Sequence, residues 1–191
     1  SEPVAPGSYV KKARVSSGAT GVATKKPEYI LNLEASTVLK HILEGKGYKV
    51  IMTRESHDVN ISNSERAIFA NNNKADMVVR VHADSLNNPG KTGASILIPA
   101  KESKYTTAIY EDSQNCANLI SSKMKEAGIK VNGVFERGDL TGFNWSQVPV
   151  VLVEMGFLSN YTEDQMMSNP EYQTKLMQAI SDGLDEYFAN K

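Results

Sequence analysis

A histidine stands at the end of a predicted strand, and its placement points to chemistry. The segment Met77–Ser85, MVVRVHADS, is apolar up to His82 and polar after it. A strand-end imidazole is either a buried structural group bonded to a backbone carbonyl or a metal ligand, with Asp84 as the carboxylate that orients the ring. The other two histidines, His41 within a predicted helix and His57 in a polar loop, are expected to have no function.

Two glutamates add candidate acid–base or ligand groups. Glu28 follows Pro27 at the start of a predicted helix, where it is either a first-turn acid that favours the helix dipole or a metal ligand. Glu154 lies in the apolar run VVLVEMGF, where an unpaired charge would cost several kcal/mol or raise the pKa. It is therefore either paired with Arg80 or Arg137, or it is a general acid or base poised near neutral pH.

Together these three side chains suggest a zinc hydrolase. Zinc accepts nitrogen and carboxylate ligands, keeps a position for water, and lowers the pKa of that water to about 7. A free glutamate beside it would take the proton. Catalytic zinc usually has three protein ligands, and the pattern offers two, so spacing alone indicates the class of site without completing it.

Hydrophobic periodicity predicts the elements that must position these residues. Helices are expected over 28–46, 63–74, 112–128 and 169–188, the second of them capped by Asn63 or Ser64. Strands are expected over 48–54, 75–83, 93–100 and 148–157. The stretch 1–27, rich in Gly, Pro, Ser and Thr, is predicted to be a loop-rich lead-in.

This alternation predicts one α/β domain over residues 1–191, with a mainly parallel twisted sheet and helices on both faces. In such sheets, sites gather beyond the carboxyl ends of the strands. Because His82 ends one strand and Glu154 lies near the end of another, both are expected at the same rim of the sheet.

Composition narrows the classes of partner. The 21 basic and 22 acidic residues give a net charge of −1 and form no basic stripe, which argues against nucleic acid or an anionic membrane as the main partner. No apolar run is long enough for a membrane span, and no signal peptide is recognised. The single Cys116 excludes an intrachain disulfide and a cysteine-based metal cluster.

Three ordered blocks carry a resemblance to a known family. They are PEYILNLEASTVLKHILEGKGYKVIMTR, SERAIFANNNKADMVVRVHADS and VPVVLVEMGFLSN. In order and spacing they resemble the zinc-dependent N-acetylmuramoyl-L-alanine amidases of bacterial cell-wall turnover, the amidase type 3 family, and the similarity runs from about Glu2 to Phe188. Three ordered blocks are far more specific than one short motif.

The resemblance implies a role for each of the three residues. Glu28, which opens EYILNL, matches a zinc ligand and is selected over Glu34; His82 in VHAD matches a second ligand; Glu154 matches the catalytic acid or base. The implied reaction is hydrolysis of the amide between N-acetylmuramic acid and the L-alanine of the stem peptide, with Zn²⁺ as cofactor. Peptidoglycan is then the substrate, the location is the cell wall outside the cytoplasm, and the setting is wall turnover or sporulation. A monomer is expected, and an activating protein is a compatible partner.

The sequence departs from the family at one point. The family begins with a strand that ends in an Asp-x-Gly-His motif, whose histidine is the third zinc ligand, and this sequence starts after that place. Either the chain as given lacks its natural N-terminus, which is the expectation, or it is an inactive or partner-completed form. Two alternatives to the amidase follow: a catalytically silent peptidoglycan-binding or regulatory domain of the same fold, and a zinc peptidase that cuts within the stem peptide.

Three further residues have weaker assignments. Asn144 and Trp145 precede the strand of Glu154 and either line a groove for peptide or sugar or belong to a loop packed for structural reasons. Arg66 matches a position in the family, and an ion pair that anchors its helix is the favoured interpretation.

Overall fold

Four strands form the central sheet, in the order β3-β6-β4-β5. They are β3 (Val78–Asp84), β4 (Ala94–Pro99), β5 (Val131–Arg137) and β6 (Val150–Phe157) in the computed structural model, which describes residues 1–191. β3 is parallel to β6 and β4 is parallel to β5, whereas β4 and β6 run antiparallel. The predicted α/β domain with a mainly parallel sheet is confirmed, with one antiparallel junction at its centre.

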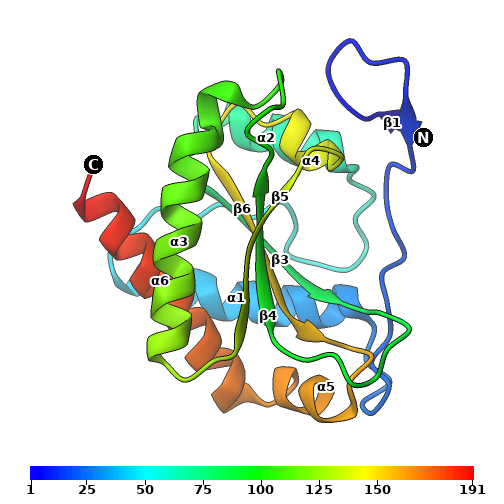
Figure 1. Cartoon of the computed structure of the whole chain (residues 1–191), viewed down its shortest axis with the longest axis vertical. Coiled ribbons are helices and arrows are strands. Elements are labelled where there is room, and N and C mark those ends of the chain that lie inside the picture. Colours follow the sequence, from blue (N-terminus) through cyan, green and yellow to red (C-terminus); the bar gives the residue numbers. More distant parts are fainter.

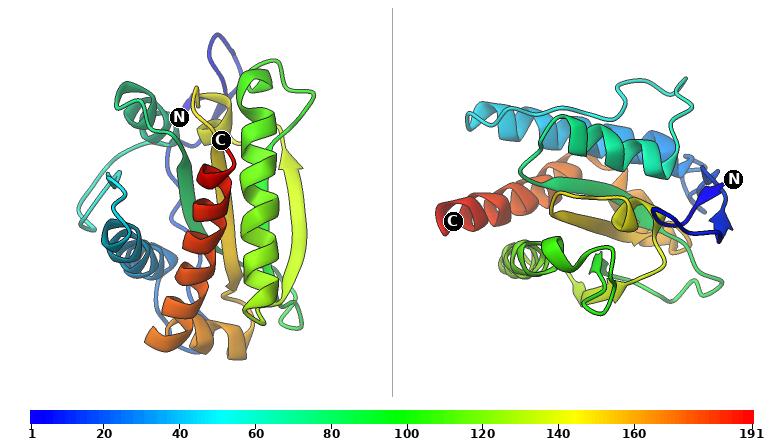
Figure 2. Two further views of the ribbon diagram at one scale, coloured as in Figure 1. Left: turned by 90° about the vertical axis from the view of Figure 1, so that its left-hand side faces the viewer. Right: turned by 90° about the horizontal axis from the view of Figure 1, so that it is seen from above.

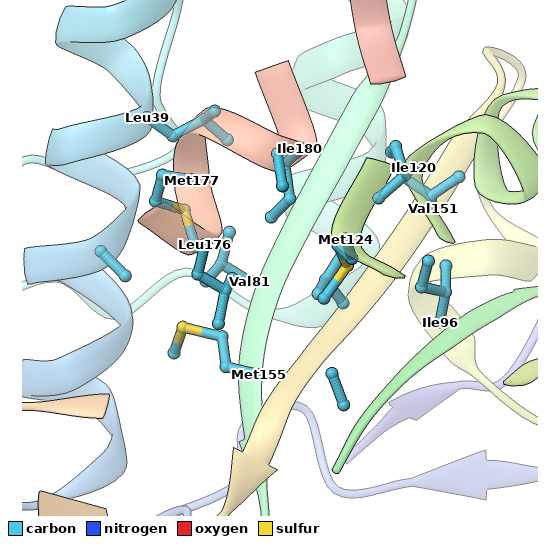
Figure 3. Packing of buried hydrophobic residues seen from close by; sticks show 14 of the residues in the cluster. Leu39, Val81, Ile96, Ile120, Met124, Val151, Met155, Leu176, Met177 and Ile180 are labelled. Atoms are coloured by element: carbon cyan, nitrogen blue, oxygen red, sulfur yellow. The ribbon is translucent and has the colours of Figure 1, made fainter. Parts of the chain in front are cut away.

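Alternation along the strands directs the large core cluster to one face of the sheet, and a smaller apolar cluster together with His82 and Glu154 to the other. Val81, Val151, Met155 and Ile96 belong to the large core cluster, and Figure 3 shows their side chains between the sheet and the helices. Residues one position away point to the opposite face. Among these is Glu154, the only member of β6 that is not fully buried.

Three long helices cover the apolar face and the edge beside β3. They are α1 (Glu28–Gly45), α3 (Tyr110–Glu126) and α6 (Pro170–Ala189). α3 and α6 lie side by side against the sheet, and α1 packs on α6 and along β3 (Figures 1 and 2). α3 and α6 approach so closely that a Cβ on Gly183 would lie 2.6 Å from the Cα of Ile120. None of the helices combines the length and apolarity that a membrane span requires.

The opposite face is covered at one end only. The 3-10 helix η1 (Thr107–Ile109) and the short α4 (Thr141–Asn144) place Ile109 and Phe143 over Val150 and Leu152, and α2 (Asn63–Asn72) packs on α4. Helices therefore lie on both faces as predicted. Toward the carboxyl ends of β3 and β6, on this second face, the side chains of His82 and Glu154 stay partly exposed.

Residues 1–27 run along the side of the molecule away from α3 and α6 (Figure 2). Their regular structure is a two-residue antiparallel pairing of β1 (Glu2–Pro3) with β2 (Lys11–Lys12). The segment ends at Pro27, which takes the N-cap position of α1 in an extended conformation. Glu28, the next residue, therefore lies in the first turn of α1.

Several predicted elements differ from those observed. The strand expected over 48–54 is absent: Tyr48 and Val50 pack on the main core instead, and the outer edge of β3 pairs with no other strand among residues 1–191. Without a neighbouring strand, an apolar run cannot form the ladder of hydrogen bonds that defines a strand.

α2 is capped by Ser62, in a capping box with Glu65, rather than by either predicted residue. β5, α4 and α5 (Tyr161–Met167) were not predicted, because they are short or lack clear periodicity.

Candidate active site

Glu28 is held in place by donors from three parts of the chain. Its Oε2 accepts from the backbone N–H of Ala19 at 3.2 Å, and its Oε1 accepts from Nδ2 of Asn32 at 3.1 Å and from the N–H of Ala83 at 3.3 Å. Gly18 has a positive φ of 71°, and a Cβ there would lie 2.7 Å from Oε2. Burial raises the pKa of Glu28, but hydrogen bonds from His82, Asn32 and Ala19 outweigh it and lower the pKa to about 2. Glu28 is therefore a fixed anion at neutral pH.

His82 lies directly beside this carboxylate. Its Nδ1 is 3.1 Å from Oε1 of Glu28, and about a third of its side chain is exposed (36%). Burial lowers the pKa of His82, and the charges of Arg80 and Arg66 lower it further, while the hydrogen bond with Glu28 opposes them. The imidazole is consequently neutral at pH 7, the state in which it can bind a metal.

Glu154 is the next residue across the sheet from His82. The two are register partners on the parallel strands β6 and β3, so their side chains point to the same face. Oε2 of Glu154 is buried and has no hydrogen-bond partner. Burial and the nearby negative charges of Asp84 and Glu28 raise its pKa to about 8. This carboxyl group can exchange a proton near neutral pH.

The structural alternative for Glu154 is wrong. Arg137 pairs instead with Asp139, from Nε to Oδ1 at 2.7 Å, and Arg80 donates from Nη2 to Oδ1 of Asn63 at 3.1 Å. Neither arginine lies within ion-pair distance of Glu154, although both charges partly offset the rise in its pKa. Burial lowers the pKa of Arg80 to about 10, still far above neutrality.

The remaining predicted residues lie outside this group. Asn144 is buried and donates to the carbonyls of Val4 and Gly138, and the indole N–H of Trp145 donates to the carbonyl of Pro3 at 3.0 Å. Both side chains hold the N-terminal segment, which favours the structural alternative over substrate binding.

Asp84 and Arg66 also differ from expectation. Asp84 accepts from the N–H of Ser85 at 2.7 Å and forms no hydrogen bond with His82, whose carboxylate partner is Glu28. The ion pair expected of Arg66 is absent, because its Nη1 donates to Oγ1 of Thr53 at 3.0 Å and no carboxylate pairs with it. His41 is exposed on α1, and His57 lies in a loop against the ring of Tyr29.

Asn32 and the Gly18–Ala19 turn are parts of the site that the sequence did not single out. Asn32 lies four residues after Glu28, a spacing at which helical side chains meet, so the sequence spacing could have predicted this contact. No sequence pattern predicts the contact of Ala19 with Glu28, because it depends on how residues 1–27 fold back on α1.

The donor chemistry matches part of a zinc site. Glu28 and His82 offer one carboxylate oxygen and one ring nitrogen 3.1 Å apart, and both types of atom are zinc ligands. No group of three or more His, Cys, Asp or Glu side chains converges anywhere in residues 1–191 in a way that could hold a metal ion. The pair therefore fits two positions of a metal centre and does not supply a third.

An ionised carboxylate, a neutral imidazole and a carboxyl group with a raised pKa lie together near the carboxyl ends of β3 and β6, and these are groups that a metal-assisted hydrolase would need. The chain belongs to the family Amidase_3, described as N-acetylmuramoyl-L-alanine amidase, which matches residues 12–186.

Individual relatives agree with this membership. The chain is 28% identical over 166 residues to the "Probable cell wall amidase LytH" of Staphylococcus saprophyticus, covering 86% of this chain and 51% of that protein. The apo crystal structure of the amidase Ami1 from Mycobacterium abscessus superposes with a TM-score of 0.85 at 26% identity, over 93% of this chain and 85% of that one. An N-acetylmuramoyl-L-alanine amidase from Clostridium difficile 630 has a TM-score of 0.82 at 27% identity, over 92% and 91%. The chain thus spans about half the length of the curated LytH relatives it matches.

Proposed function

We propose that this chain hydrolyses the amide that joins the lactyl group of N-acetylmuramic acid to the L-alanine of the peptidoglycan stem peptide. The family supports the reaction class. The observation that carries the proposal is Glu154, whose Oε2 is buried without a partner and whose pKa is about 8, beside the partly exposed His82. A carboxyl group in this state would be destabilising in a purely structural role.

Each residue has a distinct role in the proposed reaction. Glu154 accepts a proton from the attacking water as the water oxygen bonds to the carbonyl carbon, and it delivers that proton to the nitrogen as the C–N bond breaks. A pKa near the working pH suits both transfers. Glu28 stays ionised throughout because its pKa is about 2. The products are the lactyl carboxylate and a free amino group on L-alanine.

Zn²⁺ is the proposed cofactor, with Glu28 and His82 as two of its ligands. Bound there, zinc would polarise the scissile carbonyl and activate water. Hydrogen bonds from Asn32, Ala19 and Ala83 orient the Glu28 carboxylate, and the neutral state of His82 leaves one ring nitrogen with a free lone pair for coordination. The third ligand is proposed to come from solvent or from outside these residues.

The setting follows from the substrate. We propose that the chain acts on peptidoglycan outside the cytoplasm, in wall turnover or sporulation. A monomeric state and an activating protein partner stay predictions.

One rival function is favoured by a specific observation. Because Glu28 and His82 supply only two metal donors, a silent domain of the same fold that binds peptidoglycan without cutting it is the second candidate. The unpartnered carboxyl of Glu154 argues against it, since a binding module has no need for such a group.

Product analysis separates these functions. Purified peptidoglycan is digested with the zinc-loaded chain and with its Glu154→Gln variant, and new amino termini are labelled and identified. New amino-terminal alanine from the parent alone supports the amidase. Any other new amine indicates a peptidase, and binding to the wall without a new amine from either protein indicates the silent domain.

A further inference from the structure

Three of the five arginines gather beside the active site without a carboxylate partner. The two surface arginines are paired: Arg14 with Glu65 at 3.0 Å, and Arg137 with Asp139 at 2.7 Å. The other three, all partly exposed, form no ion pair. We call Arg54, Arg66 and Arg80 the arginine cluster.

The cluster brings together β3, α2 and the loop that carries Thr53 and Arg54, on the side of the sheet that carries His82 and Glu154. Arg80 of β3 donates to Asn63 of α2, and it lies so close to α4 that a Cβ on Gly142 would be 1.5 Å from its Nη1. Arg66 lies three residues after Asn63 on α2 and therefore shares its side of the helix. It donates to Thr53, the residue before Arg54.

The hydrogen bonds of the cluster leave most of its donors free. A guanidinium has five N–H donors. Arg66 and Arg80 each use one of them, and both acceptors are neutral side chains. Arg54 differs, because it donates to the backbone carbonyls of Tyr29 at 2.7 Å and Ser56 at 3.2 Å. These bonds attach its loop to the start of α1.

Acidic groups near the cluster offset its charge only in part: Glu154 and Glu2 favour the charged form of Arg80 without forming an ion pair with it. Glu2 is buried and its Oε2 is engaged by Ser64, while Glu154 and Glu28 belong to the active site. None of them forms an ion pair with an arginine of the cluster. Like charges held together in a partly desolvated place are destabilising unless an anion joins them.

The position of the cluster indicates which anion it takes. Arg80 is two residues before His82 on the same face of β3, a separation of roughly 7 Å along a strand. One residue of extended peptide spans about 3.3–3.6 Å, so two residues cover the same distance. A stem peptide whose scissile amide lies at His82 and Glu154 can therefore bring the carboxylate of its second residue to the cluster.

We propose that Arg66 and Arg80, supported by Arg54, bind the free carboxylate of the stem-peptide residue that follows L-alanine. The planar guanidinium fork matches a carboxylate, and its bonds to an anion are stronger than those to neutral acceptors. This inference rests on the proposed amidase function, and it makes the cluster the determinant of stem-peptide preference.

The test compares two synthetic ligands by calorimetry in the Glu154→Gln background, where turnover is blocked. They are N-acetylmuramoyl-L-alanyl-D-glutamate with its γ-carboxyl group capped as a methylamide, and the analogue of this compound with the α-carboxylate replaced by a carboxamide, each titrated with Zn²⁺ present. The acid should bind at least about tenfold more tightly than the amide. Arg66→Gln and Arg80→Gln should each bring this ratio close to one by weakening the acid alone. Arg14→Gln, the matched control at a paired surface arginine, should keep it.

Several outcomes would overturn the assignment. They are equal binding of acid and amide by the parent, no binding of either at millimolar concentration, or a ratio that survives both substitutions. Inorganic phosphate provides a further arm: if it binds in a cluster-dependent manner while the acid and amide bind equally, the cluster is an anion site unrelated to the stem peptide.

Thermal unfolding shows whether each variant is folded. If Arg80→Gln is unfolded, the comparison of acid and amide binding is made with Arg66→Gln alone. Because the readout is binding, it is independent of whether digestion yields amino-terminal alanine. If the parent binds the acid more tightly than the amide but digestion yields no amino-terminal alanine, the proposed reaction is rejected and the arginine cluster is still supported as a carboxylate site.

Discussion

The carboxylate of Glu28 and the imidazole of His82 lie 3.1 Å apart, although 54 residues separate them in the chain. One opens a helix and the other ends a strand. The contact exists because α1 runs along β3, with the first turn of the helix at the carboxyl end of the strand. This pair is the anchor of the proposed metal centre, and Glu154 adjoins it from the next strand.

Removing the imidazole should remove the metal. In His82→Ala, zinc affinity should fall by at least about tenfold, because losing a ligand costs at least as much as losing a group that merely supports one. Elemental analysis after dialysis and a zinc titration would measure this. His41→Ala, on the exposed side of α1, is the control and should bind zinc as the parent does. Unchanged zinc content in His82→Ala would remove His82 from the ligand set.

Replacing the carboxyl of Glu154 should stop hydrolysis without disturbing the metal. Glu154→Gln keeps the shape of the side chain but cannot accept and return a proton, so the rate of amine release should fall by about 10²–10⁴-fold. Zinc content should stay close to that of the parent, and near pH 5, where the carboxyl group of the folded parent is protonated, the thermal unfolding midpoint should also be unchanged. Near-normal turnover would refute the catalytic assignment.

Stability of the metal-free protein should depend on the ionisation of Glu154. Its pKa is raised from 4.5 to about 8 in the folded state, so the folded protein holds this proton more tightly than the unfolded chain does. The free energy of unfolding therefore declines as pH rises from about 4.5 to about 8, and this contribution is constant above that range.

The same substitution isolates this effect. With chelator present, Glu154→Gln should match the parent near pH 5 and exceed its unfolding free energy by roughly 1–4 kcal/mol near pH 8.5, a range reduced for partial solvent access. Denaturant titration at both pH values measures the difference. A variant that gains nothing at the higher pH would show that the carboxyl is not desolvated.

Close packing of α3 on α6 should make Gly183 intolerant of a side chain. Gly183→Ala would place Cβ 2.6 Å from backbone of Ile120, so the helices must separate, and a loss of about 1–3 kcal/mol in unfolding free energy is expected. Gly45→Ala at the end of α1 meets nothing within 4 Å and should be neutral or stabilising by up to about 1 kcal/mol. Equal effects at the two glycines would contradict the packing observed here.

The resemblance to the family predicts that a third ligand would complete the metal centre. A version of the chain that carries an added N-terminal strand ending in Asp-x-Gly-His should bind one zinc per molecule more tightly than the 191-residue chain. Zinc titration of both, with the histidine of the added motif changed to alanine as the control, measures the gain. If the two affinities are equal, the proposed third position is not filled in this way.

The sequence by itself determined the class of fold. The alternating pattern of apolar runs located β3, β4 and β6 and the helices α1, α3 and α6 within a few residues, because burial of one face imposes its period on the chain. It also located Glu154 as an acid in an apolar strand and His82 at a strand end. The energetic penalty of a buried carboxylate makes such a residue conspicuous in any sequence.

Tertiary structure decided what these residues contact. Periodicity gives neither strand register nor neighbouring segments, so the sequence left Glu154 with two possible arginine partners, and the fold paired it with neither. The sequence also predicted a strand over 48–54, and this segment has no neighbouring strand with which to form hydrogen bonds. Strand pairing requires two segments, and the apolar pattern of one segment does not show whether a partner lies beside it. The Glu28–His82 contact and the arginine cluster arise in the same way: each depends on long-range packing of a helix against β3, which no local pattern encodes.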